Sequence, residues 1–155
     1  MATPIVEYIA ANLLTTLSGI TVANGYDNTV TAERLVRLGN RVRDKLVVLE
    51  QGDTRRSEDV GERDQYQAIG WFQTFYVTCY AIESESSSTA IETRLNSLRS
   101  DVEKAVMVDP HRGNYAVDTF LVSATRVTDA EAAAEAVVVE IEVYYRVLHT
   151  SPYTQ

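Results

Sequence analysis

The residue types that most often carry out chemistry are few in this chain and lie far apart. There are two histidines, His111 and His149, and one cysteine, Cys79. None of them stands at the short spacings that zinc and non-haem iron sites use. The acidic stretch Asp53–Asp64 lacks the ligand order and central glycine of an EF-hand, so we interpret it as solvated. The sequence therefore predicts no metal site.

Patterns that mark catalytic nucleophiles and phosphate-binding loops are missing from the sequence. There is no Gly-x-Ser-x-Gly, Gly-x-Gly-x-x-Gly or Gly-Lys-Ser. Glu140 and Glu142 would lie about 7 Å apart on one face of a strand, a separation that glycosidases use. They occupy the polar positions of an amphipathic strand, however, which favours solvated or interface charges. We therefore expect no catalytic centre and no cofactor, and we predict that the protein is not an enzyme.

Length and charge narrow the class of protein. The chain has 155 residues, which suits one domain over residues 1–155. Its formal charge is −8, with 22 acidic against 14 basic residues, which argues against a free-standing nucleic-acid binder. The lone Cys79 excludes an internal disulfide and lies in an apolar run, so we expect it to be buried. The sequence has no apolar run of about 18 residues and no basic, apolar leader, so we expect no membrane and a cytoplasmic site of synthesis.

Two segments have the period of an amphipathic helix. The first has Thr3 as a candidate cap, Pro4 in its first turn, an apolar repeat, and a stop at Ser18-Gly19. The second begins with Thr89-Ala90-Ile91-Glu92, which has the form of a capping box, and ends before Asp109-Pro110. The apolar stripes of the two segments are Ile5, Ile9, Leu13 and Leu17 in the first, and Ile91, Leu95, Leu98, Val102 and Val106 in the second.

The remaining regular segments have the composition or alternation of β-strands. We predict strands over Thr29–Leu38, Lys45–Glu50, Tyr66–Ile82, Tyr115–Val127 and Glu135–His149. A helical turn over residues 33–38 is an open alternative for part of the first of these strands. Both faces of Tyr66–Ile82 are apolar, so we expect a helix on one face and another chain on the other. The order of elements predicts an α+β fold: a mainly antiparallel sheet of four to five strands with two helices packed on one face.

A polar stretch and a basic cluster are expected to lie on the surface of the protein. The stretch after Glu50 is polar, and we expect a mobile loop over about residues 51–65. A basic cluster precedes it, made up of Arg34, Arg37, Arg41, Arg43 and Lys45. This cluster is open to two interpretations. It is either a solvated face paired locally with the acidic loop, or a patch that faces a neighbouring subunit or a tube.

The order of segments along the chain forms a recognisable pattern. A short helix and a glycine turn lead into Thr29-Val30-Thr31; a long aromatic strand and a capped helix follow. The chain then closes on Val139–Val147, of the type Val-Glu-Ile-Glu-Val-Tyr-Tyr-Arg-Val, followed by Pro152-Tyr153. This order resembles the tail-terminator (tail-completion, minor tail) proteins of long-tailed bacteriophages. The resemblance implies a homohexameric ring that binds the last ring of the tail tube, ends tube polymerisation, and presents a surface to a neck or head-completion protein.

The same resemblance implies a place and a set of partners. The protein would be assembled in the bacterial cytoplasm and would reside in the tail or neck of the virion, and genomic DNA would pass through the ring without specific binding. We expect residues 149–155 to form a docking arm. Two alternatives remain: another neck or head-completion protein, and a small ligand-binding or enzymatic α+β domain with a pocket under the helices. The candidate interface residues are Arg34, Arg37, Arg41, Arg43, Arg55, Arg56, Tyr76, Tyr80, Tyr144, Pro152 and Tyr153.

Overall fold

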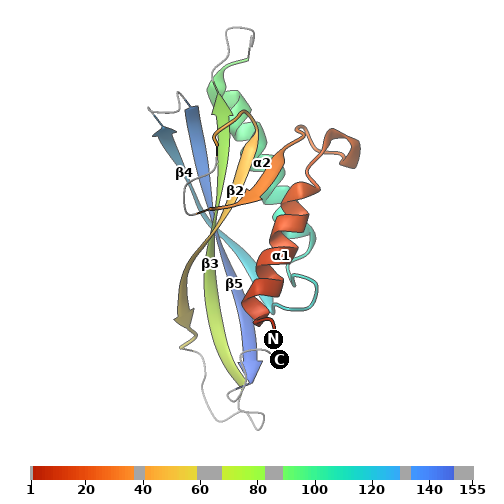
Figure 1. Ribbon diagram of the computed structural model, residues 1–155, viewed down its shortest axis with the longest axis vertical. Helices are drawn as coiled ribbons and strands as arrows, with labels where there is room; N and C mark the ends of the chain where they lie inside the picture. Colours follow the sequence, from red (N-terminus) through yellow and green to blue (C-terminus); the bar gives the residue numbers. More distant parts are fainter. Residues whose placement is uncertain (1, 37–40, 59–67, 83–88, 130–133, 149–155) are drawn as a thin grey trace.

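A computed structural model gives the protein an α+β fold. The structure describes residues 2–36, 41–58, 68–82, 89–129 and 134–148 (Figure 1). The elements are α1 (Ile5–Ser18), the 3-10 turn η1 (Val22–Asn24), β1 (Thr31–Arg34), β2 (Leu46–Arg56), β3 (Ala68–Ile82), α2 (Ile91–Val108), β4 (Asp118–Asp129) and β5 (Ala134–Leu148). The predicted fold class is confirmed, and so is the predicted order of helices and strands.

The five strands form one mixed, mostly antiparallel sheet in the order β1-β2-β3-β5-β4. The two longest strands, β3 and β5, pair along their whole length at its centre and run through most of the molecule (Figure 1). The prediction of a mainly antiparallel sheet is confirmed; the parallel pair is formed by β1 and β2. The segment between them, residues 35–45, is about the dozen residues that a parallel connection needs.

The core lies between the helices and one face of the sheet. The inward side chains of β3 and β5 face each other across the pairing, as Phe75 does Ile141 and Val77 does Val139. The apolar stripes of both helices cover this face, with α1 over β1 and β2, and α2 over β3, β5 and β4. Each fully buried aliphatic side chain contributes about 1.5–3 kcal/mol, so this layer accounts for most of the favourable free energy of folding. The predicted burial of Cys79 is confirmed.

Both helices begin one residue later than the predicted threonine caps require. The N-cap residues are Pro4 and Ala90, and neither helix has a side-chain cap hydrogen bond. The predicted Thr3 cap and the capping box that starts at Thr89 are therefore wrong. Glu92 lies in the first turn of α2, where a carboxylate is favourable to the helix dipole, and its carboxylate contacts Arg126 of β4 instead of reaching back along the helix.

The polar stretch after Glu50 continues strand β2, so the predicted mobile loop is wrong for residues 51–56. Ser57 is buried, and its backbone nitrogen donates to the Gly70 carbonyl oxygen at 2.9 Å. Residues 59–65 of the predicted loop lie outside the described residues. The polar composition predicted a loop, but backbone pairing with the long strand β3 holds this end of β2 in the sheet. Arg55 pairs with Phe72 and Arg56 with Trp71 in the register. A strand at this position keeps polar side chains exposed while its backbone is satisfied.

A bulge interrupts the pairing of β2 and β3 between Gln51 and Thr54. Gln73, which is 1% exposed, satisfies the backbone there. Its amide nitrogen donates to the carbonyl oxygens of Gly52 at 2.8 Å and Thr74 at 2.9 Å, and its amide oxygen accepts from the Thr54 hydroxyl at 2.6 Å. The extra residue in a bulge moves every later side chain of the strand to the opposite face. The bulge therefore decides which face of the sheet each side chain at the polar end of β2 points to.

Two buried polar side chains tie loops to helix α2. The carboxylate of Asp101 accepts from the backbone nitrogen of Asn28 at 2.8 Å and from its side-chain amide at 2.9 Å. Arg112 is fully buried and has a backbone φ of 49°. Its guanidinium donates to the Val106 carbonyl oxygen in the last turn of α2, where a cation is also favourable to the helix dipole. Burial lowers the pKa of Arg112, and the nearby carboxylate of Asp109 opposes that shift.

Candidate interaction surfaces

The face of the sheet opposite the helices carries a cluster of aromatic and charged side chains centred on Phe72. We call this the outer face. The register aligns Arg55, Phe72 and Tyr144 on the neighbouring strands β2, β3 and β5. The Arg55 guanidinium carbon lies 4.1 Å from the centre of the Phe72 ring, and the Tyr144 ring stacks on the other side at 4.9 Å. Phe120 of β4 lies 6.5 Å from Phe72.

Arg55 also makes a two-pronged ion pair on this face. Its Nε and Nη2 donate to the two carboxylate oxygens of Glu142 at 3.0 and 3.1 Å. Without the bulge in β2, Arg55 would align with Trp71 on the helix-facing side of β3. The bulge therefore places Arg55 beside Phe72 and Glu142. The predicted interface charge Glu142 is part of this pair, and Glu140 accepts a hydrogen bond from the Ser123 hydroxyl at 2.9 Å.

Two of the predicted aromatic residues lie flat over glycines of neighbouring strands. A Cβ atom on Gly70 would lie 2.6 Å from the Tyr144 hydroxyl, and one on Gly52 would lie 2.7 Å from a ring carbon of Tyr76. Tyr80 is half-buried and faces the same way, opposite Ala136. The structure thus places Tyr76, Tyr80, Tyr144 and Arg55 on the outer face, with Tyr144 and Arg55 beside Phe72 and Tyr80 eight residues farther along β3. The expected second chain over this face remains a prediction.

The basic cluster is paired locally, though not with the partners that we expected. The Arg34 guanidinium donates to the Glu7 carboxylate of α1 at 2.8 Å, and Arg43 pairs with Glu33 of β1. Pairing with the acidic stretch after Glu50 is not seen among the described residues. Arg41 is exposed, whereas Arg37 lies outside the described part of the chain. Since Glu33 and Arg34 belong to β1, the alternative of a helical turn is wrong for them.

Strand β4 forms one edge of the sheet and exposes apolar side chains on both of its faces. It pairs with β5, and no strand in the described part of the chain pairs with its other side. Phe120 and Leu121 point to opposite faces because side chains alternate along a strand, and a bulge follows between Leu121 and Ser123. The exposed fractions are 43% for Phe120, 39% for Leu121, 50% for Val122 and 46% for Val127. A long apolar edge of this kind is a template for pairing with another chain.

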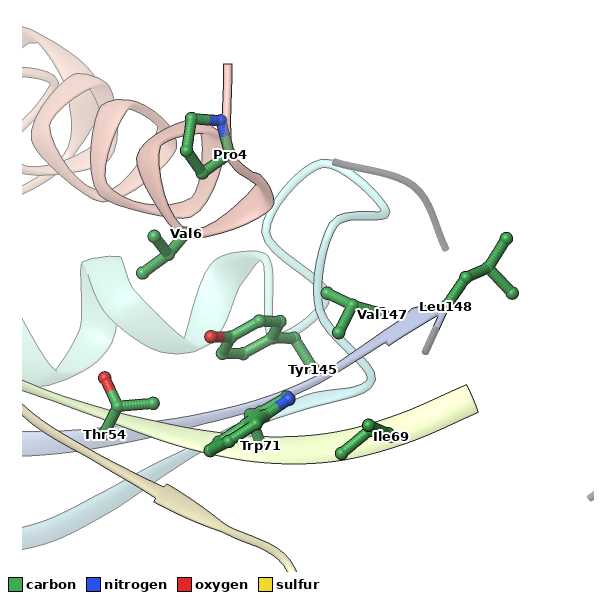
Figure 2. Close-up of a pocket in the computed structure, with 8 residues that line it drawn as sticks. All are labelled: Pro4, Val6, Thr54, Ile69, Trp71, Tyr145, Val147 and Leu148. Carbon is green, nitrogen blue, oxygen red and sulfur yellow. The ribbon is translucent and has the colours of Figure 1, made fainter. Parts of the chain in front are cut away.

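A pocket of about 340 Å³ lies between the start of α1 and the ends of β3 and β5. Figure 2 shows Pro4 and Val6 of the α1 end across the pocket from Trp71 and Ile69 of β3. Val147 and Leu148 complete the apolar wall, and Thr54 and Tyr145 bring hydroxyl groups to the lining. Burial raises the pKa of the Tyr145 hydroxyl, so this group stays a neutral donor.

Titratable and ligand-type side chains do not gather into a reaction centre in the described part of the chain. No three His, Cys, Asp or Glu side chains among those residues are placed to hold a metal ion. Burial raises the pKa of the Cys79 thiol to about 12, which keeps it protonated and unreactive. The exposed His111 ring nitrogen Nδ1 lies 2.8 Å from the Val117 carbonyl oxygen in the turn after α2. No helix in that part of the chain is long and apolar enough to span a membrane.

The structure distributes the predicted interface residues over separate regions. Arg34 and Arg43 lie at the β1 side of the sheet, and the exposed Arg41 precedes Arg43 by two residues. Arg55 and the tyrosines lie on the outer face, and Arg56 is exposed at the end of β2. Pro152 and Tyr153, with the rest of the predicted arm 149–155, lie outside the described residues. The exposed apolar side chains of β4 were missed because alternation assigns a strand's faces but not its place at a sheet edge. The sequence signal that could have revealed them is the run Phe120-Leu121-Val122, three consecutive apolar residues within a strand.

The chain matches no protein-family model, and no curated protein is detectably similar to it in sequence.

Proposed function

We propose that this chain is a structural protein of the tail-terminator type. Its copies form a ring, with six subunits as the expected number, that caps the tail tube of a long-tailed phage and ends tube polymerisation. The opposite side of the ring offers a surface to a neck or head-completion protein. Genomic DNA passes through the ring, and the protein performs no catalysis of its own.

The observation that carries this proposal is the apolar edge strand β4. A subunit that exposes Phe120, Leu121 and Val122 along an edge is prone to pair with other chains. In a closed ring each copy covers that edge of its neighbour, so a ring removes the exposure without open-ended growth. The resemblance in the order of elements supports the choice of a tail terminator among ring-forming proteins.

The outer face provides a second support. Tyrosine and arginine are the side chains most enriched at the centres of protein interfaces. Here Tyr144, Phe72 and Arg55 are stacked on one another and held by the ion pair to Glu142. This order limits the side-chain entropy that binding would cost. The proposal assigns this face to contact with the tube or the neck.

Tube capping is the property to test. The purified protein should give ring-shaped particles in negative-stain images at tens of micromolar. When it is added to tail tubes assembled from the tube protein of the same genome, it should arrest their growth and bind their ends. A particle that stays monomeric with and without tubes would refute the proposal. Rings that leave tubes unaffected but bind a head portal would favour the alternative, another neck or head-completion protein.

The pocket favours a second candidate function, binding of a small apolar ligand. Its wall is formed mainly by Ile69, Trp71, Val147 and Leu148, with the Tyr145 hydroxyl as a neutral donor. A volume of about 340 Å³ lies at the lower end of the range for small-molecule sites. Tryptophan fluorescence reports on this pocket because Trp71 lies in its lining. Saturable quenching by medium-chain fatty acids or substituted benzenes, lost in Val6→Phe, which fills the pocket and keeps the chain's single tryptophan, would support this candidate.

A further inference from the structure

We propose that the apolar edge of β4 docks against the β1 side of a second copy of this chain, so that the two ends of the sheet form the contact between ring subunits. This inference deepens the proposed function and rests on it. We define the β4 surface as Phe120, Leu121, Val122 and Val127 with the charged residues Asp118, Arg126 and Glu135. We define the β1 surface as Leu35 with Arg34, Arg41 and Arg43.

Each surface combines exposed apolar side chains with charge. Leu35, directly after β1, is 48% exposed, comparable to the apolar side chains of β4. The two surfaces lie at opposite ends of the strand order β1-β2-β3-β5-β4. A contact between opposite ends of the same molecule is head-to-tail, which is the type that closes into a ring.

The charges of the two surfaces are complementary. On the β4 side, Arg126 is shared between Glu92 and Glu135, and Asp118 adds a further acid at the start of the strand. On the β1 side, Arg34 and Arg43 have Glu7 and Glu33 as partners, and the exposed Arg41 adds a further base. The excess is therefore acidic at one end of the sheet and basic at the other. Opposite potentials favour this register and disfavour others.

The same charges argue against pairing of β4 with the β4 of another copy. Such a pair would bring together two copies of the same acidic excess, made up of Asp118, Glu92 and Glu135 around Arg126. Like charges that face each other across an interface disfavour the contact. Of the two ways to cover β4 with a second copy, the head-to-tail contact is the favourable one.

Two blocked variants test this contact. Val122→Lys/Val127→Lys puts positive charge on the β4 surface, and Leu35→Glu/Arg41→Glu puts negative charge on the β1 surface. The replaced side chains are all exposed. Val22→Lys, at a residue that is 62% exposed on η1, is the control for the apolar-to-lysine changes. Arg99→Glu, on the exposed side of α2, is the control for charge reversal.

Native mass spectrometry of the full chain gives the readout. Each blocked variant alone should be monomeric at concentrations where the wild type and both controls form rings. An equimolar mixture should form a heterodimer of one copy of each variant, because the mixture still contains one intact β1 surface and one intact β4 surface. The two altered surfaces carry lysine and glutamate charges of opposite sign, so heterodimers that join further into rings of alternating variants would support the same contact. Circular dichroism melts identify any variant that does not fold, in which case the single changes Val122→Lys and Arg41→Glu replace it.

The outcomes separate this inference from the proposed function. If the wild type forms rings but the mixture stays monomeric, or if the β1-blocked variant still assembles alone, the assigned contact is wrong and the ring remains. A homodimer of the β1-blocked variant would identify β4–β4 pairing as the actual contact. A wild type that is monomeric with and without tail tubes would overturn both proposals.

Discussion

Replacing Gln73 with methionine should destabilise the protein through the bulge in β2. Methionine has nearly the length of glutamine and fills the same buried space, but it has no amide to donate or accept. The change removes the donors to the Gly52 and Thr74 carbonyl oxygens, which lie at 2.8 and 2.9 Å, and the acceptor for the Thr54 hydroxyl. The exposed Thr54 hydroxyl finds water instead, so the two carbonyl groups decide the size of the effect.

Leaving a buried polar group without a partner costs about 1–3 kcal/mol. The backbones of Gly52 and Thr74 belong to half-buried residues, which places each carbonyl near the lower end of that range. We therefore expect Gln73→Met to lose about 2–3 kcal/mol of unfolding free energy. For a domain of this size, that corresponds to a fall in Tm of roughly 4–12 °C.

Urea unfolding monitored by circular dichroism measures this loss. The midpoint should fall while the m-value stays unchanged, since the surface exposed on unfolding is the same. Gln51→Met is the matched control, because the Gln51 amide is exposed and contacts Gln73 at 3.4 Å, and its effect should stay within about 0.5 kcal/mol. A Gln73→Met variant as stable as the wild type would show that the bulge does not depend on this amide.

Three other changes test separate parts of the structure. Arg112→Met should cost about 1–3 kcal/mol in urea unfolding, because it leaves the Val106 carbonyl at the end of α2 without its buried donor; a loss below 1 kcal/mol would contradict that role. Because the pKa of the native Cys79 thiol is raised to about 12 from a usual value of 9.0, the unfolded chain releases this proton first. Stability should therefore fall above pH 9, by up to about 1.4 kcal/mol per pH unit, and Cys79→Ala should remove that part of the slope. Arg55→Met should change stability by only about 0–1 kcal/mol, since the Arg55 end of the ion pair to Glu142 is exposed to solvent, yet should weaken binding of rings to tubes; equal tube binding would exclude the outer face from that contact.

Periodicity predicted the elements because it is a local property. The positions of Ile9 and Leu13 along α1, and of Val139 and Ile141 along β5, repeat at 3.6 and 2 residues, and these side chains are buried as expected. The helix caps were predicted less well. A threonine near a helix start matches the capping pattern whether or not the backbone places it at the N-cap. Here the N-cap residues are Pro4 and Ala90.

The candidate site was predicted in part. Tyr76, Tyr80 and Tyr144 were selected because they alternate with core residues, and they do share the outer face. Their surroundings could not be predicted from the same pattern. Phe72 lies between Arg55 and Tyr144 because three strands far apart in the sequence are neighbours in the sheet.

By itself the sequence determined the class of fold, the helices and strands, and, for β5, which side of the strand enters the core. These features follow from the spacing of apolar residues within one segment. Burial of those apolar side chains is the dominant favourable term in folding. Only the tertiary structure decided that β1 runs parallel to β2, that β4 forms an edge, and that Arg55 faces outward. Each of these depends on which strands become neighbours and on a one-residue bulge. A change of one residue in register reverses the face of every later side chain while leaving the local pattern the same.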